Sequence, residues 1–198
     1  MKRWLEAKQD RVWLGDRVPA LEKHYVVREH DRLMRKAASL VVGDSVLDVG
    51  CGLGHLYEHV TRLNSDVKYL GLDQSADMLK RARARHPSAR FEQGNIYDMD
   101  LPKFDTVACL DVLHHQPALD PALSVLLKQA RKALVVTIWI HERYKGGKHE
   151  KQYTGNWGEI ITWHTAKELR EKFPNLKYEV YRGIGWAWRD VYRFFPGA

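Results

Sequence analysis

Three glycines and an acidic residue stand at spacings that predict a binding site for a small ligand. The stretch VLDVGCGLGH, residues 46–55, runs from apolar residues into Gly50, Gly52 and Gly54, and Asp48 comes just before them. A glycine turn between a strand and a helix lets the backbone approach a ligand closely, and the free N–H groups at the start of the helix attract an anion. We therefore expect a ligand to be held by the backbone at this turn.

Two common nucleotide-binding motifs do not fit this stretch. In a P-loop, Lys and then Ser or Thr follow the last glycine, whereas Gly54 is followed by His55 and Leu56. In the dinucleotide motif G-x-G-x-x-G, a longer gap separates the last two glycines than the single residue between Gly52 and Gly54. Asp48 would also repel a pyrophosphate, but it would attract an ammonium group. An alternative function is that of a nicotinamide-dependent oxidoreductase, which has the same kind of sheet. Preferential binding of NADH would support that alternative.

A second acidic residue follows at the distance expected for a ribose contact. Asp73 ends the apolar stretch YLGLD about twenty residues after the glycines, where a carboxylate can accept hydrogen bonds from both ribose hydroxyls. The predicted ligand therefore has a ribose and an amino-acid end in place of a pyrophosphate. S-adenosylmethionine meets both demands.

At these residues the sequence resembles the class I S-adenosylmethionine-dependent methyltransferases, over roughly residues 40–140. VLDVGCGLG and LGLDQS are similar to the family's first and second motifs, and FEQGNIYDMDLP and FDTVACLDVLHHQP to its adenine-binding segment and fourth motif. The resemblance implies S-adenosylmethionine as cofactor, S-adenosylhomocysteine as product, and no metal. It implies these cofactor-binding residues, of which Met78 is equally well explained as a core residue: Asp48, Gly50, Cys51, Gly52, Gly54, Asp73, Gln74, Met78, Asn95, Ile96, Leu110 and Asp111.

Two histidines follow the fourth motif, at the end of a predicted strand. An imidazole that titrates near neutral pH can take the proton that a hydroxyl or amine acceptor must lose. If one of the two is catalytic, we prefer His115 over His114 as the general base. The alternative is that both only pack or face water, since the family often has a histidine here that it does not use.

Aromatic residues are candidates for binding the methyl acceptor. The segment from His141 to Trp163 interleaves basic and aromatic residues and follows the fifth predicted strand, where the resembling enzymes have their acceptor site. The alternative is a solvated loop that a few aromatic residues anchor. The candidate acceptor residues are Tyr25, Trp139, Tyr153, Trp157 and Trp163.

The sequence leaves two classes of methyl acceptor open, a small molecule and RNA. Residues 110–113 are Leu-Asp-Val-Leu, without the Asn/Asp-Pro-Pro-aromatic motif of enzymes that methylate base amines, and Cys109 lacks the preceding proline of a cytosine C5 enzyme. The small size favours an oxygen or nitrogen of a small molecule. The net charge of +7 and the basic segment favour RNA, such as a modified wobble uridine, whose methyltransferases also have a His-His pair. A third reading is a non-catalytic partner protein that keeps the cofactor-binding fold.

Alternating apolar and helical patterns must position these residues. Apolar runs over 45–49, 67–73, 89–95, 104–113 and 133–140 predict strands, and helical patterns over 55–63, 75–86 and 119–132 separate them. This alternation predicts an α/β fold with a doubly wound, mostly parallel sheet and helices on both faces. Ligands of such sheets bind beyond the carboxyl ends of the strands.

The end of the chain predicts a different connection. A helical pattern over 165–173 precedes strand-like runs over 176–183 and 184–195, whose short link permits only an antiparallel hairpin. In the last run, Trp186, Trp188, Tyr192 and Phe194 share a period of two, which predicts core packing on one strand face rather than a base-stacking platform. The resemblance makes this the antiparallel last strand of a seven-stranded sheet.

Length and composition are those of one globular domain. We expect 198 residues to divide into a helical N-terminal segment (1–41), a cofactor-binding core (42–140), an acceptor-side insertion (141–164) and a final helix with hairpin (165–198). No apolar run approaches the ~20 residues that span a bilayer, so we expect a cytoplasmic protein without a membrane partner. Cys51 and Cys109 are expected to be free thiols, and the oligomeric state is open.

Overall fold

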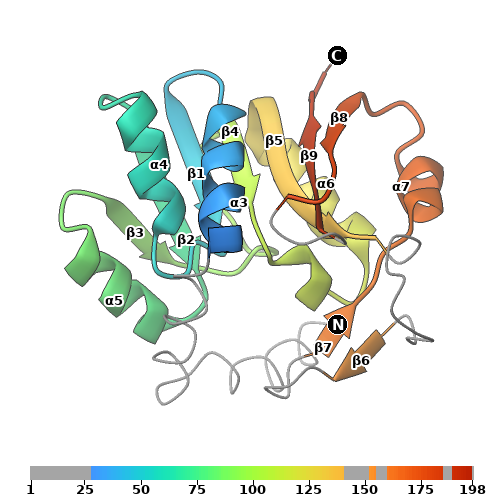
Figure 1. The fold of residues 1–198 in the computed structure, drawn as a ribbon, viewed down its shortest axis with the longest axis horizontal. Coiled ribbons are helices and arrows are strands. Elements are labelled where there is room, and N and C mark those ends of the chain that lie inside the picture. Colours follow the sequence, from blue (N-terminus) through green and yellow to red (C-terminus); the bar gives the residue numbers. More distant parts are fainter. Residues whose placement is uncertain (1–27, 141–151, 155–159, 185–188, 198) are drawn as a thin grey trace.

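The computed structural model describes residues 28–140, 152–154, 160–184 and 189–197. Its centre is a seven-stranded sheet with the order β3-β2-β1-β4-β5-β9-β8, beside a separate two-stranded sheet of β6 and β7 (Figure 1). The strands are β1 (Ser45–Val49), β2 (Lys68–Asp73), β3 (Arg90–Gln93), β4 (Phe104–Cys109), β5 (Ala130–Trp139), β6 (Gln152–Thr154), β7 (Ile160–Thr162), β8 (Tyr178–Tyr181) and β9 (Arg189–Phe194). The helices are α3 (Arg28–Ser39), α4 (His55–Leu63), α5 (Ala76–Arg85), the 3-10 turn η2 (Leu113–His115), α6 (Leu119–Gln129) and α7 (Ala166–Lys172).

The strand directions confirm the doubly wound architecture. Strands β1 to β5 pair in parallel, in the order that runs outward from β1 to β3 and then returns to β4 on the other side of β1. The last strand, β9, lies between β5 and β8 and is antiparallel to both. The order therefore reverses between β1 and β4, which is the place where open α/β sheets bind their ligands.

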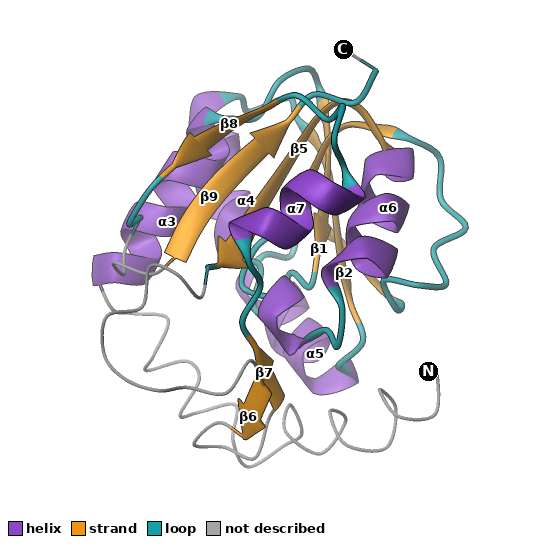
Figure 2. Ribbon diagram, turned by 90° about the vertical axis from the view of Figure 1, so that its right-hand side faces the viewer, coloured by secondary structure: helices purple, strands orange, loops and turns teal. Residues whose placement is uncertain are grey.

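Helices cover both faces of the sheet because successive side chains of each strand point to opposite sides. Val46 packs in one core with α3, α4 and α5, whereas its neighbour Leu47 packs in a second core with α6 and α7. Figure 2 shows α3 and α6 on opposite sides of the strands. No helix among the described residues is long and apolar enough to cross a membrane.

Local signals set where several helices begin. The hydroxyl of Ser75, the N-cap residue of α5, accepts a hydrogen bond from the backbone N–H of Met78. Thr165 and Glu168 form a reciprocal capping box at the start of α7. Of the expected N-terminal segment, α3 is described from Arg28 onward, and residues 1–27 lie outside the described part of the chain.

Two predicted boundaries differ from the structure. The strand predicted over 104–113 ends at Cys109, because Asp111 has a left-handed backbone with φ 54° and residues 113–115 form η2. The helix predicted over 119–132 ends at Gln129, and β5 begins at once with Ala130. Helix α6 and strand β5 therefore join directly, without an intervening loop.

The last strand is more buried than a period of two predicts. Tyr192 and Phe194 share a core face with their rings stacked 5.8 Å apart, as expected. Arg189 and Val191 on the opposite face are also fully buried, however, because α3 and the end of β4 cover that side. Trp186 and Trp188 lie outside the described residues.

The glycine that begins α4 yields a test of packing. A Cβ atom at Gly54 would lie 2.8 Å from Cζ of Phe91, and the residue has φ 77°. We expect Gly54→Ala to lower the free energy of unfolding by about 1–3 kcal/mol in urea denaturation, through backbone strain and overpacking. Gly197→Ala is the control, since its φ is 79° but no atom lies within 4 Å of the added Cβ. An equal decrease in the free energy of unfolding for both variants would show that the contact between the added Cβ and Phe91 does not destabilise the protein.

Candidate cofactor-binding site

A pocket opens at the carboxyl ends of β1, β2 and β4, where the strand order reverses. Its walls contain most of the residues that the sequence predicts for cofactor binding, together with His115. The predicted residues that line it are Gly50, Gly52, Asp73, Gln74, Met78, Asn95, Ile96, Leu110 and Asp111. The residues that line it without having been predicted are Val49, Gly94, Val112 and Gln116.

A second pocket adjoins the first and shares four lining residues with it. Asp48 and Cys51, both predicted, line only this second pocket. Sequence reasoning missed its far wall, where His30 and Met34 come from α3, because an amphipathic helix carries no signal for the partner it covers. The shared residues are Gly50, Gly52, Leu110 and Asp111. The two pockets are therefore neighbouring parts of one site.

The glycines of the turn meet different demands. A Cβ at Gly50 would overlap with Cγ2 of Val112, so this position must be glycine for the turn to fit under the end of β4. Gly54 lines neither described pocket and instead packs against the rings of Phe91 and His86. The sequence attributed all three glycines to close approach of a ligand. The structure assigns the space at Gly54 to packing behind the turn.

Asp73 stands at the end of β2 with its carboxylate fixed by the backbone. Oδ2 accepts a hydrogen bond from the N–H of Gly52 over 2.9 Å, and Oδ1 accepts one from the N–H of Ser75 over 2.9 Å. Burial raises the pKa of this carboxyl, and these backbone hydrogen bonds oppose the rise. The carboxylate therefore lines the pocket in one orientation, with lone pairs left for a ligand's hydroxyl groups.

Asp48 is deeper and has different partners. Its side chain is 3% exposed, and Oδ2 accepts a hydrogen bond from the hydroxyl of Tyr69 over 2.6 Å. Burial raises the pKa of Asp48 to about 7, with a smaller contribution from the nearby charge of Asp73, while the Tyr69 hydrogen bond acts in the opposite direction. The carboxyl thus titrates near neutral pH at the border of the second pocket.

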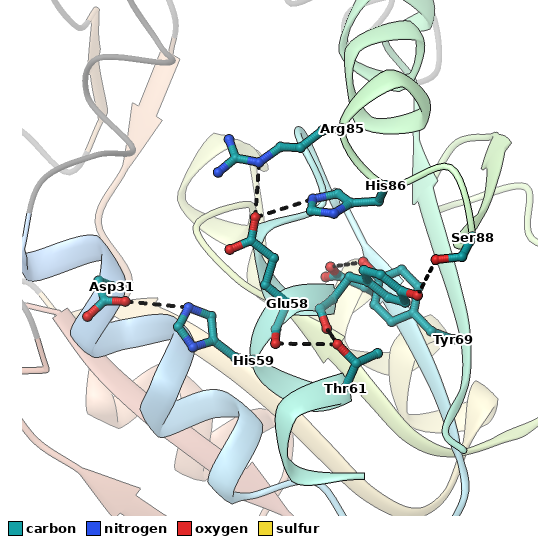
Figure 3. A network of polar contacts seen from close by, with 10 residues as sticks. Asp31, Glu58, His59, Thr61, Tyr69, Arg85, His86 and Ser88 are labelled. Carbon is teal, nitrogen blue, oxygen red and sulfur yellow. Dashed lines mark hydrogen bonds and ion pairs between the residues drawn. The ribbon is translucent and has the colours of Figure 1, made fainter. Parts of the chain in front are cut away.

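Polar contacts attach the helix after the glycine turn to its neighbours (Figure 3). On α4, Glu58 accepts a hydrogen bond from Arg85 over 3.0 Å and lies 3.7 Å from Nε2 of His86, at the end of α5. His59 lies 3.5 Å from the carboxylate of Asp31 on α3. These contacts hold α4 between α3 and α5, so the N-terminus of α4 keeps its position at the site.

Asp111 joins the site to the last strand. Its backbone N–H donates to the hydroxyl of Thr137 over 2.6 Å, and its carboxylate forms an ion pair with Arg189. The sequence placed Asp111 near the cofactor but gave no role to Thr137 or Arg189. A charged residue in an apolar strand could have raised the question of a buried partner, but no local pattern identifies that partner.

The two histidines are both buried, and their ring centroids are 3.9 Å apart. Only His115 lines the first pocket, whereas the ring of His114 stacks on Trp139, with 3.9 Å between ring centroids and 11° between planes. Burial lowers the pKa of His114 well below its usual value, and the neighbouring His115, His164 and Arg189 act in the same direction. The geometry favours a packing role for His114 and leaves His115 facing the site.

The expected acceptor residues are only partly described. Trp163 is buried and Trp139 half-buried, with their rings 5.4 Å apart beyond the histidine pair. Tyr25 and Trp157 lie outside the described residues, as do residues 141–151, and the side chain of Tyr153 is not described either. Within the described ranges, no group of three or more His, Cys, Asp or Glu side chains could hold a metal ion.

Comparison with known proteins identifies a family. Residues 40–184 match the family model described as a methyltransferase domain. A curated relative, the ubiquinone biosynthesis O-methyltransferase of Alkalilimnicola ehrlichii, is 38% identical over 90 residues, which are 42% of this chain and 35% of that protein. The match thus spans only about a third of that relative's length.

Solved structures with low sequence identity share the fold. DesVI from Streptomyces venezuelae has a TM-score of 0.73 and 23% identity, over 93% of this chain and 100% of that chain. CalS10, an amino pentose methyltransferase from Micromonospora echinaspora solved with S-adenosylmethionine bound, has a TM-score of 0.71 and 18% identity, over 92% and 98%. Because the family match covers well over half of the chain, the protein belongs to the methyltransferase domain family and has the Rossmann-like fold of class I S-adenosylmethionine-dependent methyltransferases.

Proposed function

We propose that the protein transfers the methyl group of S-adenosylmethionine to an oxygen or nitrogen atom of a small-molecule acceptor. The observation that carries the proposal is the pocket at the ends of β1, β2 and β4, where Gly52 and the carboxylate of Asp73 meet. The relative from Alkalilimnicola ehrlichii is named an O-methyltransferase, and KedS8 from Streptoalloteichus, whose solved structure has a TM-score of 0.70 and 18% identity, is named a sugar N-methyltransferase, so both kinds of acceptor atom have support.

The residues of the first pocket suit the adenosine half of the cofactor. Asp73 would accept hydrogen bonds from the ribose hydroxyls, because its carboxylate is already oriented by two backbone donors. Met78 and Ile96 are apolar walls for a flat ring, and Asn95 supplies polar groups at its edge. Gln74, which follows Asp73 in the chain, lines the same pocket.

The residues of the second pocket suit the amino-acid end. Asp48 would attract the ammonium group, and burial strengthens that attraction because the local dielectric constant is low. Leu110 and Asp111 border both pockets, so they would lie beside the point where the two halves of the cofactor join. A pyrophosphate would meet the carboxylates of Asp48 and Asp73 and be repelled.

For methyl transfer, the protein mainly has to align the methyl donor with the acceptor and to provide a group that takes up a proton. When bound, S-adenosylmethionine supplies a methyl group that its sulfonium makes electrophilic. The chain would align donor and acceptor and exclude water. His115, which lines the same pocket, would take the proton that a hydroxyl or amine loses.

A transfer experiment tests both the reaction and the acceptor class. We expect the protein to move labelled methyl from S-adenosylmethionine into the small-molecule fraction of a cell extract. Nuclease-sensitive label would instead identify RNA as the acceptor. Cofactor binding without label in any fraction would support the reading as a non-catalytic partner protein.

The same experiment measures the role of His115. A His115→Asn variant should bind S-adenosylhomocysteine like the wild type but transfer methyl roughly a hundredfold more slowly, the usual size of a general-base effect. An unchanged rate would leave His115 as a wall residue only.

Asp73 gives the most direct test of the cofactor site. We expect Asp73→Ala to weaken binding of S-adenosylhomocysteine by roughly a hundredfold, since a buried pair of hydrogen bonds to the ribose is lost, which calorimetry would measure. Asp105→Ala is a matched control, because that carboxylate also accepts a backbone N–H, from Asp44, but lies away from both pockets. Wild-type affinity in Asp73→Ala would refute the ribose assignment.

The pKa of Asp48 predicts a pH dependence of binding. In the free protein this pKa is about 7, and a bound ammonium group would favour the charged carboxylate and lower it. Binding of S-adenosylhomocysteine should therefore release a proton near pH 7. Its affinity should rise with pH, by roughly tenfold between pH 6 and pH 8. Calorimetry in buffers with different ionisation enthalpies measures the released proton. Asp48→Asn should bind weakly at all pH values and release no proton; the same release in this variant would exclude Asp48 as its source.

A further inference from the structure

A fully buried arginine lies beneath the site without a part in the proposed chemistry. Arg189 is the first residue of β9, and it pairs in register with Trp139 of β5. Its guanidinium reaches three separate segments of the chain. It forms an ion pair with the carboxylate of Asp111, its Nε donates to the carbonyl oxygen of Ile184 over 3.1 Å, and its Nη2 donates to the carbonyl oxygen of Glu29 over 3.5 Å.

The first of these segments is the turn after β4. Asp111 is the only non-glycine residue of the described chain with a positive φ, and such a backbone persists only where its surroundings fix it. Thr137 fixes it from one side, through the hydroxyl that accepts the Asp111 N–H over 2.6 Å and lies 3.2 Å from Oδ1. Arg189 fixes it from the other, at Oδ2. The turn therefore depends on β5 and β9 together.

The second segment is the first turn of α3. Glu29, whose carbonyl oxygen accepts from Arg189, precedes His30, and His30 and Met34 form the α3 wall of the second pocket. Asp111 lines the same pocket. One guanidinium thus contacts a lining residue, Asp111, and the residue directly before another, His30, in the pocket that suits the cofactor's amino-acid end. The first pocket, by contrast, is lined at its adenosine side by Asp73, Met78 and Asn95, which Arg189 does not contact among its described hydrogen bonds.

We propose that Arg189 is a positioning residue for the amino-acid end of the cofactor, which acts by holding the Asp111 turn and the first turn of α3 at a fixed separation beside the second pocket. The inference rests on the proposed function, because it needs the cofactor in this site. It makes the last strand of the sheet, which is distant in sequence from the cofactor motifs, part of the cofactor-binding machinery. A planar guanidinium suits this task, since it donates in several directions at once.

A ligand pair separates positioning from a general structural role. S-adenosylhomocysteine carries the amino-acid end, and 5′-methylthioadenosine lacks it. Arg189→Met keeps the length of the side chain and removes its charge and donors. We expect this variant to bind S-adenosylhomocysteine at least roughly tenfold more weakly, while its affinity for 5′-methylthioadenosine changes by less than about twofold. Loss of global stability alone would weaken both ligands in the same proportion.

Two further variants keep the test decisive if Arg189→Met folds poorly. Thr137→Val removes the hydroxyl that fixes Asp111 from the other side with little change of volume, and it should produce the same selective loss. Arg193→Met is the matched control, because Arg193 is on the same strand and pairs with Glu179 of β8 at 3.6 Å but lines neither pocket. It should leave the ratio of the two affinities unchanged.

The outcomes distinguish this inference from the proposed function. A wild-type protein that binds neither ligand would refute the proposed function itself. A wild-type protein that binds S-adenosylhomocysteine, together with folded Arg189→Met and Thr137→Val variants that retain its affinity or lose both ligands equally, would overturn the positioning role alone. Selective loss of S-adenosylhomocysteine in both variants, with an unchanged ratio in Arg193→Met, would establish it.

Discussion

The geometry of the site depends on one hydrogen bond, in which the backbone N–H of Gly52 donates to the carboxylate of Asp73. Parallel pairing places Val49 of β1 beside Leu72 of β2, so the two strands end at the same edge and their following residues meet. The bond joins the glycine turn to the acidic residue 21 positions later. Together with the Ser75 N–H, it orients the carboxylate by rigid backbone donors instead of mobile side chains. The glycine turn and Asp73 thus line the same pocket.

The site gathers three carboxylates and stabilises each by different means. Asp48 has a neutral tyrosine hydroxyl and Asp73 has backbone N–H groups, and among the described residues only Asp111 of the three forms an ion pair, with Arg189. A buried carboxylate without a cation is costly, which is why burial raises the pKa of both Asp48 and Asp73. A positively charged ligand would therefore favour the charged form of both Asp48 and Asp73. A ligand with a sulfonium and an ammonium group would relieve this cost, whereas a phosphate would add to it.

Sequence reasoning succeeded where local chemistry decides the structure. The bounds of β1 and β2 and the glycine turn between β1 and α4 follow from residue type and spacing. It placed the start of β5 too late because Arg131 and Lys132 look like the end of a helix. In the structure they belong to the strand, since β5 pairs with β4 from Phe104 onward and both side chains lie within 4 Å of Asp105 (3.8 and 3.4 Å). Tertiary pairing overrides local propensity at such a boundary.

The rest of the site could not be read from local patterns, because distant segments build it. Arg189 and Asp111 are 78 positions apart, and only the insertion of β9 beside β5 brings them together. The alternation in the last strand correctly indicated a buried face, but it could not indicate that the other face is buried as well. A charged residue there is stable only with a partner, and the partner that the fold supplies is a residue of the fourth motif. The stretches that resemble the family's motifs all lie between residues 46 and 117, whereas the arginine that pairs with Asp111 comes from the last strand of the sheet.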